Sequence, residues 1–232
     1  MSEQVREMFS SIAPKYDLAN EVLSFGVHRL WRRATIKASA AKPGQRVLDC
    51  ATGTGDLALA FKRTVGDGGE VVGTDFCAPM LVHAKQKAEQ AHLRVQFEQA
   101  DATQLPYPDA GFDISSISFG IRNVDDPVKC LRELARVVRP GGRVVVLEFG
   151  QPRGLFGALY SFYSRVVMPF IGGLLTGNRS AYSYLPRTAA AFPAGDKFLA
   201  LMKESGGYSK YEAKPLLSGM AFIYVGEVAA KS

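Results

Sequence analysis

The chain has 232 residues and a formal net charge of +6; 47% of its residues are hydrophobic and 22% are charged. These fractions are ordinary for soluble globular domains, so they argue against a disordered, collagen-like or heavily membrane-embedded chain. The length suits one large domain or two small ones. The three cysteines, Cys50, Cys77 and Cys130, have no paired spacing. They therefore indicate neither a disulfide framework nor a metal site, and a reducing cytoplasm fits best.

The first 45 residues have the pattern of helices. Charges at Glu3, Arg6 and Glu7 stand where an export signal would need an apolar core, so we expect no such signal. The densest basic stretch covers residues 28–33. We expect it to be the solvated face of a helix rather than a site for a polyanion.

From residue 46 onwards, short apolar runs alternate with longer amphipathic segments, which indicates strands and helices of a parallel sheet. Helices are expected from about residue 56, over 78–91, and from Pro127, where Asp126 can cap the first turn. The run 143–147 is uniformly apolar, so we place it in the centre of the sheet. The expected strands are residues 46–51, 70–75, 94–99, 112–119 and 143–147.

Residues 154–177 contain a single charge, Arg165, in 24 residues. A transmembrane helix is the obvious alternative, but a central charge costs at least ~2.5–3.5 kcal/mol in a membrane, and Pro169 follows it. We expect an apolar cap on the sheet. Such a cap either only covers the sheet, or also receives an isoprenoid tail or contacts a membrane surface.

The C-terminal part should add a helix near residues 195–205 and two strands, 208–214 and 220–228, paired as an antiparallel hairpin at a sheet edge. We therefore expect one α/β domain over residues 1–232. Its expected parts are a helical lid (1–45), a cofactor-binding core (46–149), an apolar cap (150–194) and a C-terminal helix with its hairpin (195–232).

A glycine-rich turn, Gly53-Thr54-Gly55-Asp56-Leu57-Ala58, matches the loose dinucleotide-binding pattern, and Asp75 lies twenty residues beyond Gly55. Alone, this pattern favours a nicotinamide-dependent oxidoreductase. However, Asp49 and Asp56 bracket the place where a pyrophosphate would dock, and would repel it. S-adenosylmethionine replaces the phosphates with a cationic amino acid and a sulfonium. We therefore predict that it is the cofactor.

Further cofactor contacts are expected where the parallel strands end, because nucleotides bind outside their carboxyl ends. Asp75 can accept hydrogen bonds from both ribose hydroxyls. Asp101 can accept one from the adenine amine while the Ala102 N–H donates to the ring, and Ser118 lies near the methionine part. Each acid could instead cap a helix or be solvated in a loop, and the Thr54 hydroxyl could satisfy its own backbone. The predicted cofactor-binding residues are Asp49, Gly53, Thr54, Gly55, Asp75, Asp101, Ala102 and Ser118.

Several longer segments carry a family resemblance: VLDCATGTGD (47–56), LPYPDAGFD (105–113), SFGIRNVDD (118–126), RVVRPGGRVVVLEF (136–149), AYSYLPRTAAAFP (181–193) and FSSIAPKYDLANEVLSFGVHRLWR (9–32). With them the sequence resembles the menaquinone/ubiquinone biosynthesis C-methyltransferases over nearly its whole length. The resemblance implies a Rossmann-like methyltransferase with a seven-stranded sheet whose last strand is antiparallel. It also implies cofactor contacts at Thr54, Asp75, Asp101, Ala102 and Ser118.

The resemblance further implies that the acceptor is a polyprenyl hydroquinone methylated on a ring carbon. We expect demethylmenaquinol, with a methoxy-benzoquinol of ubiquinone biosynthesis or another phenol as alternatives. Such a substrate suits peripheral contact with the inner face of the plasma membrane. The residues leave open whether the chain forms a homodimer.

Carbon methylation requires a phenolate, because a free phenol with a pKa of about 10 is protonated at pH 7. Arg122 is the candidate to stabilise that oxyanion, unless it forms a structural ion pair with Asp125 or Asp126. Asn123 could orient the second quinol oxygen. As proton acceptor we consider Glu148, Asp17 and Tyr16, with His28 last, and the sequence does not choose among them.

Nucleic acid is not an expected partner. Amino-group methyltransferases of nucleic acids usually carry an (Asn/Asp)-Pro-Pro-(Tyr/Phe) turn after the fourth strand. Here that turn reads Ser118-Phe119-Gly120-Ile121. A module that only binds the cofactor is the remaining alternative, and a turnover assay would distinguish it.

Overall fold

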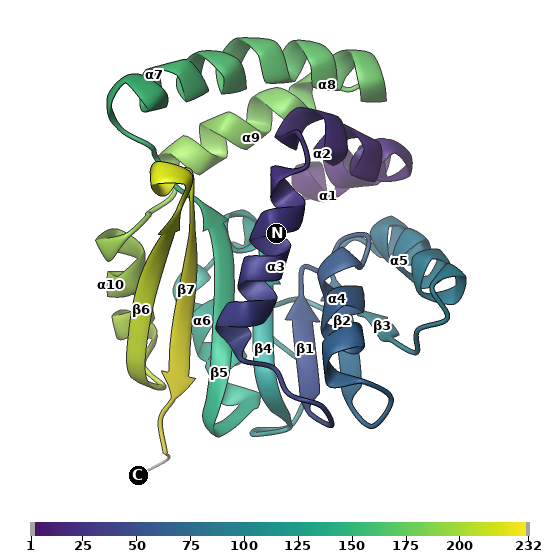
Figure 1. The fold of residues 1–232 in the computed structure, drawn as a ribbon, viewed down its shortest axis with the longest axis vertical. Coiled ribbons are helices and arrows are strands. Elements are labelled where there is room, and N and C mark those ends of the chain that lie inside the picture. Colours follow the sequence, from purple (N-terminus) through teal and green to yellow (C-terminus); the bar gives the residue numbers. More distant parts are fainter. Residues whose placement is uncertain (1–2, 231–232) are drawn as a thin grey trace.

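A seven-stranded sheet forms the centre of the computed structural model, which describes residues 3–230 (Figure 1). The strand order is β3-β2-β1-β4-β5-β7-β6. The strands from β3 to β5 in this order are parallel, whereas β7 runs antiparallel to both β5 and β6. This confirms the predicted fold class and C-terminal hairpin. The strands are β1 Arg46–Cys50, β2 Glu70–Asp75, β3 Gln96–Gln99, β4 Phe112–Ser118, β5 Val138–Phe149, β6 Tyr208–Leu216 and β7 Ala221–Val228.

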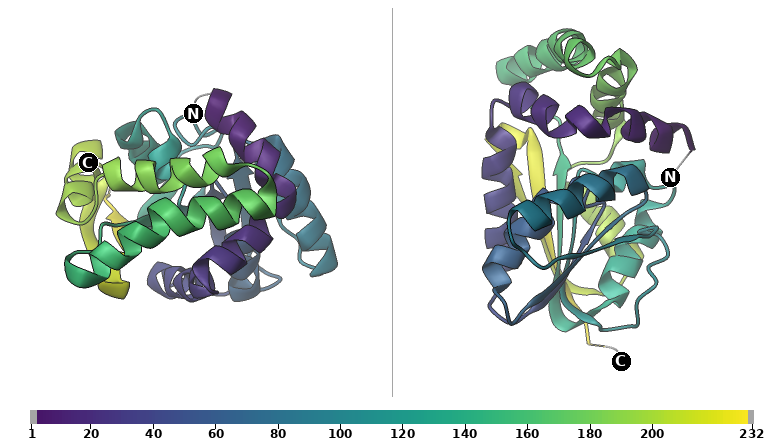
Figure 2. Two further views of the ribbon diagram at one scale, coloured as in Figure 1. Left: turned by 90° about the horizontal axis from the view of Figure 1, so that it is seen from above. Right: turned by 90° about the vertical axis from the view of Figure 1, so that its right-hand side faces the viewer.

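Helices cover both faces of the sheet, and a second group of helices lies across the carboxyl ends of its parallel strands (Figures 1 and 2). One face packs against α3, α4 and α5, and the other against α6 and α10. The helices are α1 Glu3–Ile12, α2 Tyr16–Ser24, α3 Val27–Ser39, α4 Asp56–Val65, α5 Ala78–Gln90, α6 Pro127–Arg136, α7 Gly154–Phe162, α8 Met168–Thr176, α9 Arg179–Ala191 and α10 Asp196–Ser205.

Strand β5 is buried on both faces, as its uniform apolar run predicts. Val144 and Val146 belong to the core cluster under α6 and α10. Val145 and Leu147 belong to the cluster that holds Trp31 of α3. The strand therefore lies between β4 and β7, inside the sheet.

Several strand boundaries differ from the prediction. Strand β5 begins at Val138 rather than at residue 143. The Pro140-Gly141-Gly142 stretch stays within the strand, and Val138 pairs with Phe112 across a register shift. Strand β3 begins at Gln96, two residues later than predicted. Asp126 is confirmed as the N-terminal capping residue of α6, since it accepts a hydrogen bond from the Lys129 amide at 2.9 Å.

The cap consists of α7, a π-helical turn (Tyr163–Val167), α8 and α9. The first three form one continuous helix at the outermost edge of the molecule, with α9 beneath it and α2 beside it (Figures 1 and 2). The cap packs against the N-terminal helices rather than on a face of the sheet, through Met168 and Tyr182 against Ala19 and Leu23 of α2. The sheet faces are already covered, so only the strand ends remain for it.

The continuous helix Gly154–Thr176 is long and apolar enough to cross a membrane by length and composition, and 22% of an apolar stretch of 18 residues within it is buried. One side of it is nevertheless a packing surface. Met168, Pro169 and Gly172 are buried, and Gly172 lies against the ring of Tyr182 in α9.

We expect Gly172→Ala to destabilise the protein, because a Cβ at this position would lie 2.3 Å from the Tyr182 ring. Overpacking of this kind costs roughly 1–3 kcal/mol, which outweighs the ~0.5–1 kcal/mol that alanine gains over glycine in a helix. Chemical denaturation measures the loss. Gly68→Ala is the matched control, since a Cβ there meets nothing within 4 Å. Equal stability of the two variants would contradict the tight contact.

Candidate active site

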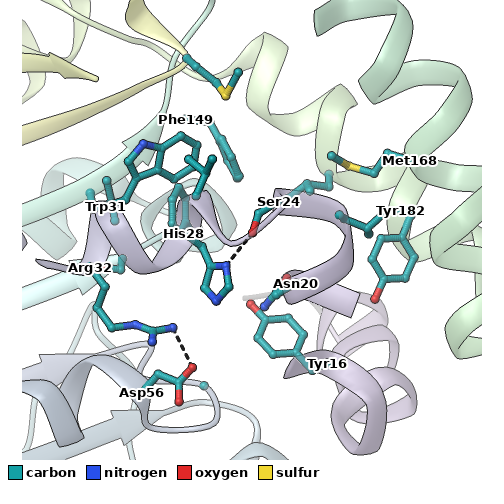
Figure 3. A pocket seen from close by; sticks show the side chains of 18 of the residues that line it. Tyr16, Asn20, Ser24, His28, Trp31, Arg32, Asp56, Phe149, Met168 and Tyr182 are labelled. Atoms are coloured by element: carbon teal, nitrogen blue, oxygen red, sulfur yellow. Dashed lines mark hydrogen bonds and ion pairs between the residues drawn. The ribbon is translucent and has the colours of Figure 1, made fainter. Parts of the chain in front are cut away.

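A cavity of about 480 Å³ lies between the carboxyl ends of β1, β4 and β5 and the helices above them. This volume is within the range of small-molecule sites. Asp49, Thr54, Ser118 and Arg122 form its polar end. Its upper part is apolar and comes from α1, α2 and the cap, with Ile12, Leu23, Met168 and Leu185 among its lining residues. Figure 3 shows part of this wall.

The glycine-rich turn follows β1 and forms the floor of the cavity. Gly53 and Gly55 have positive φ angles of 57° and 83°. A Cβ on Gly55 would lie 2.9 Å from that of Ala84, so only glycine lets the turn approach α5 this closely. The Gly53 amide donates to Asp75 at 2.8 Å, which fixes the turn to the end of β2.

Asp49 is the carboxylate that faces the cavity. Its two oxygens accept hydrogen bonds from the hydroxyls of Ser116 and Thr52, both at 2.6 Å. Burial raises the pKa of Asp49 to about 6, against the opposing effect of these hydroxyls. A cationic group beside it would favour the ionised form. Asp49 therefore suits the cationic part of the predicted cofactor.

Asp56 does not act as the prediction supposed. Arg32 of α3 donates to it at 2.7 Å, and Lys87 of α5 forms a second ion pair. Burial alone would raise the pKa of Asp56, but the two cations outweigh it and lower that pKa. The charge of Asp56 is thus compensated within the protein, and the acidic character of the turn depends on Asp49. The sequence does not reveal this, because both cations come from other helices.

Asp75, Asp101 and Ala102 lie outside the residues that line the cavity. Asp75 accepts hydrogen bonds from the amides of Gly53 and Cys77, both at 2.8 Å, which fix its carboxylate at the end of β2. Asp101 accepts hydrogen bonds from the Thr103 amide and hydroxyl, both at 2.8 Å, within the turn that follows β3. The cofactor roles of these three residues stay predictions.

Several buried polar atoms of the cavity wall have no hydrogen-bond partner within residues 3–230, among them the hydroxyl of Ser118, Nε of Arg122 and Nε1 of Trp31. Leaving such a group unpaired costs roughly 1–3 kcal/mol. Such atoms are suited to pair with a bound molecule. Together with Asp49 and the glycine-rich turn, the Ser118 hydroxyl fits S-adenosylmethionine, as the sequence predicts.

Arg122 lies in a short 3₁₀ turn after β4 (Ile121–Asn123), and its side chain is 3% exposed. Its Nη1 donates to Glu148 at 2.8 Å and to the carbonyl of Phe119. Its guanidinium also lies 5.3 Å from the centroid of the Phe149 ring. The partner is thus Glu148, at the end of β5, rather than Asp125 or Asp126 as we considered. Strand β5 thereby holds the cation at the cavity wall.

Glu148, Asp17 and Asn123 lie outside the cavity lining. Glu148 is 1% exposed and binds Arg122. Asp17 accepts from the Thr54 hydroxyl at 2.6 Å and from Lys87 at 2.8 Å. Asn123 accepts from the hydroxyl of Tyr184 at 3.1 Å. Each therefore acts on the cavity through another residue.

Tyr16 and His28 do line the cavity. Burial raises the pKa of Tyr16, which makes it a poor proton acceptor. His28 is held by Ser24, whose Oγ lies 2.6 Å from Nδ1. Of the proton acceptors that we considered, the one ranked last is thus the best placed.

Sequence reasoning missed an aromatic wall formed by Trp31, Phe119 and Phe149. Their ring centroids lie 5.9 Å (Trp31–Phe119), 6.2 Å (Trp31–Phe149) and 4.4 Å (Phe119–Phe149) apart. All three line the cavity, so they offer apolar faces to a planar ring. The positions of the two phenylalanines directly after β4 and at the end of β5 are the one signal that the sequence offered.

Comparison with known proteins agrees with this geometry. The model of the ubiE/COQ5 methyltransferase family matches residues 1–227. A ubiquinone/menaquinone biosynthesis C-methyltransferase from Bdellovibrio bacteriovorus is 60% identical over 97% of this chain and 96% of its own. A demethylmenaquinone methyltransferase from Thermus thermophilus is 51% identical over 95% and 99%, respectively.

The fold has a counterpart among solved structures. A SAM-dependent methyltransferase from Aquifex aeolicus superimposes with a TM-score of 0.63 at 18% identity, covering 85% of this chain and 89% of that one. The family match and the two relatives extend over almost the whole sequence. The chain therefore belongs to the ubiE/COQ5 methyltransferase family and is an S-adenosylmethionine-dependent methyltransferase.

Proposed function

We propose that this protein methylates a ring carbon of a polyprenyl hydroquinone, with demethylmenaquinol as the first candidate and a methoxy-benzoquinol as the second. One observation carries the proposal: a single cavity joins Asp49 and the glycine-rich turn to the buried cation of Arg122 and to an apolar chamber under the cap. The similar proteins from Thermus thermophilus and Deinococcus radiodurans are named demethylmenaquinone methyltransferases, which favours the naphthoquinol.

Arg122 supplies the electrostatic part of the reaction. When bound, S-adenosylmethionine offers an electrophilic methyl group on its sulfonium. The acceptor ring must bring electron density to the carbon beside a hydroxyl, and a phenolate does this. The guanidinium of Arg122 stabilises the phenolate oxygen through a charge-assisted hydrogen bond from Nε, which has no partner within residues 3–230.

The aromatic wall and Tyr184 orient the ring. Phe119 and Phe149 pack against its face next to Arg122, and the Tyr184 hydroxyl binds the second quinol oxygen. We predicted Asn123 for that role. Instead, Asn123 accepts a hydrogen bond from the Tyr184 hydroxyl, so the Tyr184 oxygen can itself accept a hydrogen bond from the quinol. Positioning of this kind can contribute as much as ~7–11 kcal/mol to lowering the barrier.

The cap supplies a route for the isoprenoid tail. Large apolar side chains with exposed fractions of 52–80% recur three or four residues apart along the outer helix: Leu155, Leu159, Phe162, Val166, Phe170 and Leu174. Leu159 also lines the cavity, so the cavity opens beside this stripe. The helix that carries the stripe lies at the outer end of the molecule, farthest from the sheet (Figure 1 and the right-hand view of Figure 2).

We assign this surface to contact with a membrane. Full burial of a leucine or phenylalanine side chain is worth roughly 1.5–3 kcal/mol, and between Gly150 and Gly195 the sequence has four arginines and no acidic residue. An apolar stripe with nearby positive charge suits an anionic lipid surface. The protein then acts in the cytoplasm, at the inner face of the plasma membrane, and draws the quinol from the bilayer.

The proposed reaction is tested with isotopically labelled S-adenosylmethionine and the two reduced quinones, each lacking the methyl group, in detergent. We expect label on a ring carbon of the naphthoquinol, identified by mass spectrometry and NMR of the product. Label on the benzoquinol alone would make the methoxy-benzoquinol the preferred substrate. Absence of ring methylation on both would overturn the proposal.

The role of Arg122 is tested in the double variant Arg122→Gln/Glu148→Gln, which avoids leaving Glu148 buried without its partner. We expect turnover to fall by roughly 10²–10³, as when one oxyanion donor is removed, with the calorimetric affinity for the cofactor within a few-fold of the wild type. Glu148→Gln alone keeps the guanidinium and is the control. If this single variant loses as much turnover as the double variant, Glu148 and not Arg122 carries the chemistry.

Membrane contact is tested with Phe162→Glu/Phe170→Glu in a co-sedimentation assay with phosphatidylglycerol vesicles. We expect the double variant to stay in solution while the wild type sediments, because two charges interrupt the stripe. Val82→Glu is the control, since Val82 is 54% exposed on α5, outside the cap. The assignment fails if the wild type does not bind vesicles, or if both variants bind them as the wild type does.

A further inference from the structure

Most titratable side chains around the cavity cannot accept a proton near neutral pH. Arginines keep their proton throughout the accessible range. Burial raises the pKa of the tyrosines in the wall, to about 12 in the case of Tyr182. A tyrosine stays a hydroxyl at pH 7 under these conditions and can donate a proton more readily than it can remove one.

The two carboxylates in the wall are already engaged. Asp56 is bound to Arg32 and Lys87, which lower its pKa. Asp49 accepts hydrogen bonds from two hydroxyls and lies next to the turn that receives the cationic cofactor. An ion pair with that cofactor would make Asp49 less basic. Among the described residues that line the cavity, this leaves His28.

The backbone between α2 and α3 turns His28 toward the cavity. Phe25 and Gly26 have positive φ angles of 49° and 76° and separate the two helices. His28, the second residue of α3, therefore lies in the first turn of that helix. Figure 3 shows its ring between the Arg32–Asp56 pair on one side and Tyr16 and Asn20 on the other.

Contacts from α2 fix the ring of His28. Nδ1 lies 2.6 Å from the Ser24 hydroxyl, and Nε2 lies 3.6 Å from Oε2 of Glu21. The side chain is 18% exposed. When Nδ1 donates to Ser24, Nε2 carries the lone pair and is free to take a proton. The imidazolium formed would then be stabilised by the carboxylate of Glu21.

We propose that His28 is the catalytic base that removes the hydroxyl proton of the acceptor ring. The inference rests on the proposed function. The hydroxyl proton moves to Nε2, and the ring carbon forms a bond to the methyl group while the carbon–sulfur bond breaks and its electron pair stays on sulfur. The methylated carbon then loses its hydrogen to water as a proton, and the imidazolium returns a proton to the ring oxygen. One proton is released overall, and nothing is oxidised or reduced.

The charges around His28 support a neutral resting state. Burial lowers its pKa, and so do Arg32 and Arg29 on its own helix, against the opposing effect of Glu21 on α2 and Asp56 on α4. The net direction is downward from the ordinary value of about 6.5. The imidazole is therefore unprotonated at pH 7. It becomes unable to accept a proton as the pH falls through its own pKa, so turnover should fall on the acid side.

The variant that tests the proposal is His28→Asn, which keeps a polar group beside Ser24 but has no basic nitrogen. We expect turnover at pH 7.5 to fall by roughly 10²–10⁴, the contribution of a general base, and the acid limb of its pH profile to disappear. Millimolar imidazole should restore part of the activity. Cofactor affinity should stay within a few-fold of the wild type. His92→Asn is the matched control, since His92 is exposed and lies outside the cavity lining.

The profile is measured at saturating cofactor, because protonation of Asp49 near pH 6 weakens cofactor binding in the same pH range. A second readout does not depend on turnover. The sequence has three histidines, so NMR can follow each ring through a titration, and the His28→Asn variant identifies the His28 signal. We expect that signal to titrate below 6.5.

Two results would overturn the proposal: turnover of His28→Asn within a few-fold of the wild type, or a His28 signal that titrates above 7. Failure of the proposed function is recognised separately, because the wild type would then methylate neither quinol although its His28 signal still titrates below 6.5.

Discussion

Double-sided burial of the parallel strands is the constraint on which the rest of the molecule depends. Helices cover the apolar side chains on both faces of the sheet. Strand β5 shows this most clearly, because its alternate side chains belong to two different hydrophobic clusters. Polar groups that serve a ligand can then collect only where the strands end. The N-terminal helices and the cap cover that edge together, and the space they enclose is the cavity.

Electrostatics inside the cavity depends on which charges are already paired. A buried ion pair such as Arg122–Glu148 costs desolvation energy that its attraction barely repays, so it is poor evidence of stabilisation. Its geometry is informative instead: one edge of the guanidinium is bound to β5, and Nε has no hydrogen-bond partner within residues 3–230. Asp56 shows the reverse case, since its two cationic partners leave it little influence on the cofactor.

The strands, the glycine-rich turn and the N-terminal capping residue of α6 could be predicted because each depends on residues close together in the sequence. The early start of β5 could not, since a Pro-Gly-Gly stretch commonly ends an element, whereas here it lies within the strand beside a register shift. Ion partners were missed for a related reason: Arg32 and Lys87 reach Asp56 from helices 24 and 31 residues away. His28 looked like a solvated histidine on a helix surface, and its burial depends on how α2, α3 and α4 pack together.

The contacts of Lys87 have a further consequence for how the glycine-rich turn is held. This lysine binds Asp17 and Asp56, and Asp17 in turn binds Thr54, so α2, α4 and α5 are joined at the glycine-rich turn. The side chains of these two ion pairs are 25–46% exposed. Dissolved ions screen partly exposed pairs of this kind, so the junction weakens as the ionic strength rises, whereas the apolar contacts between α2 and the cap are not screened.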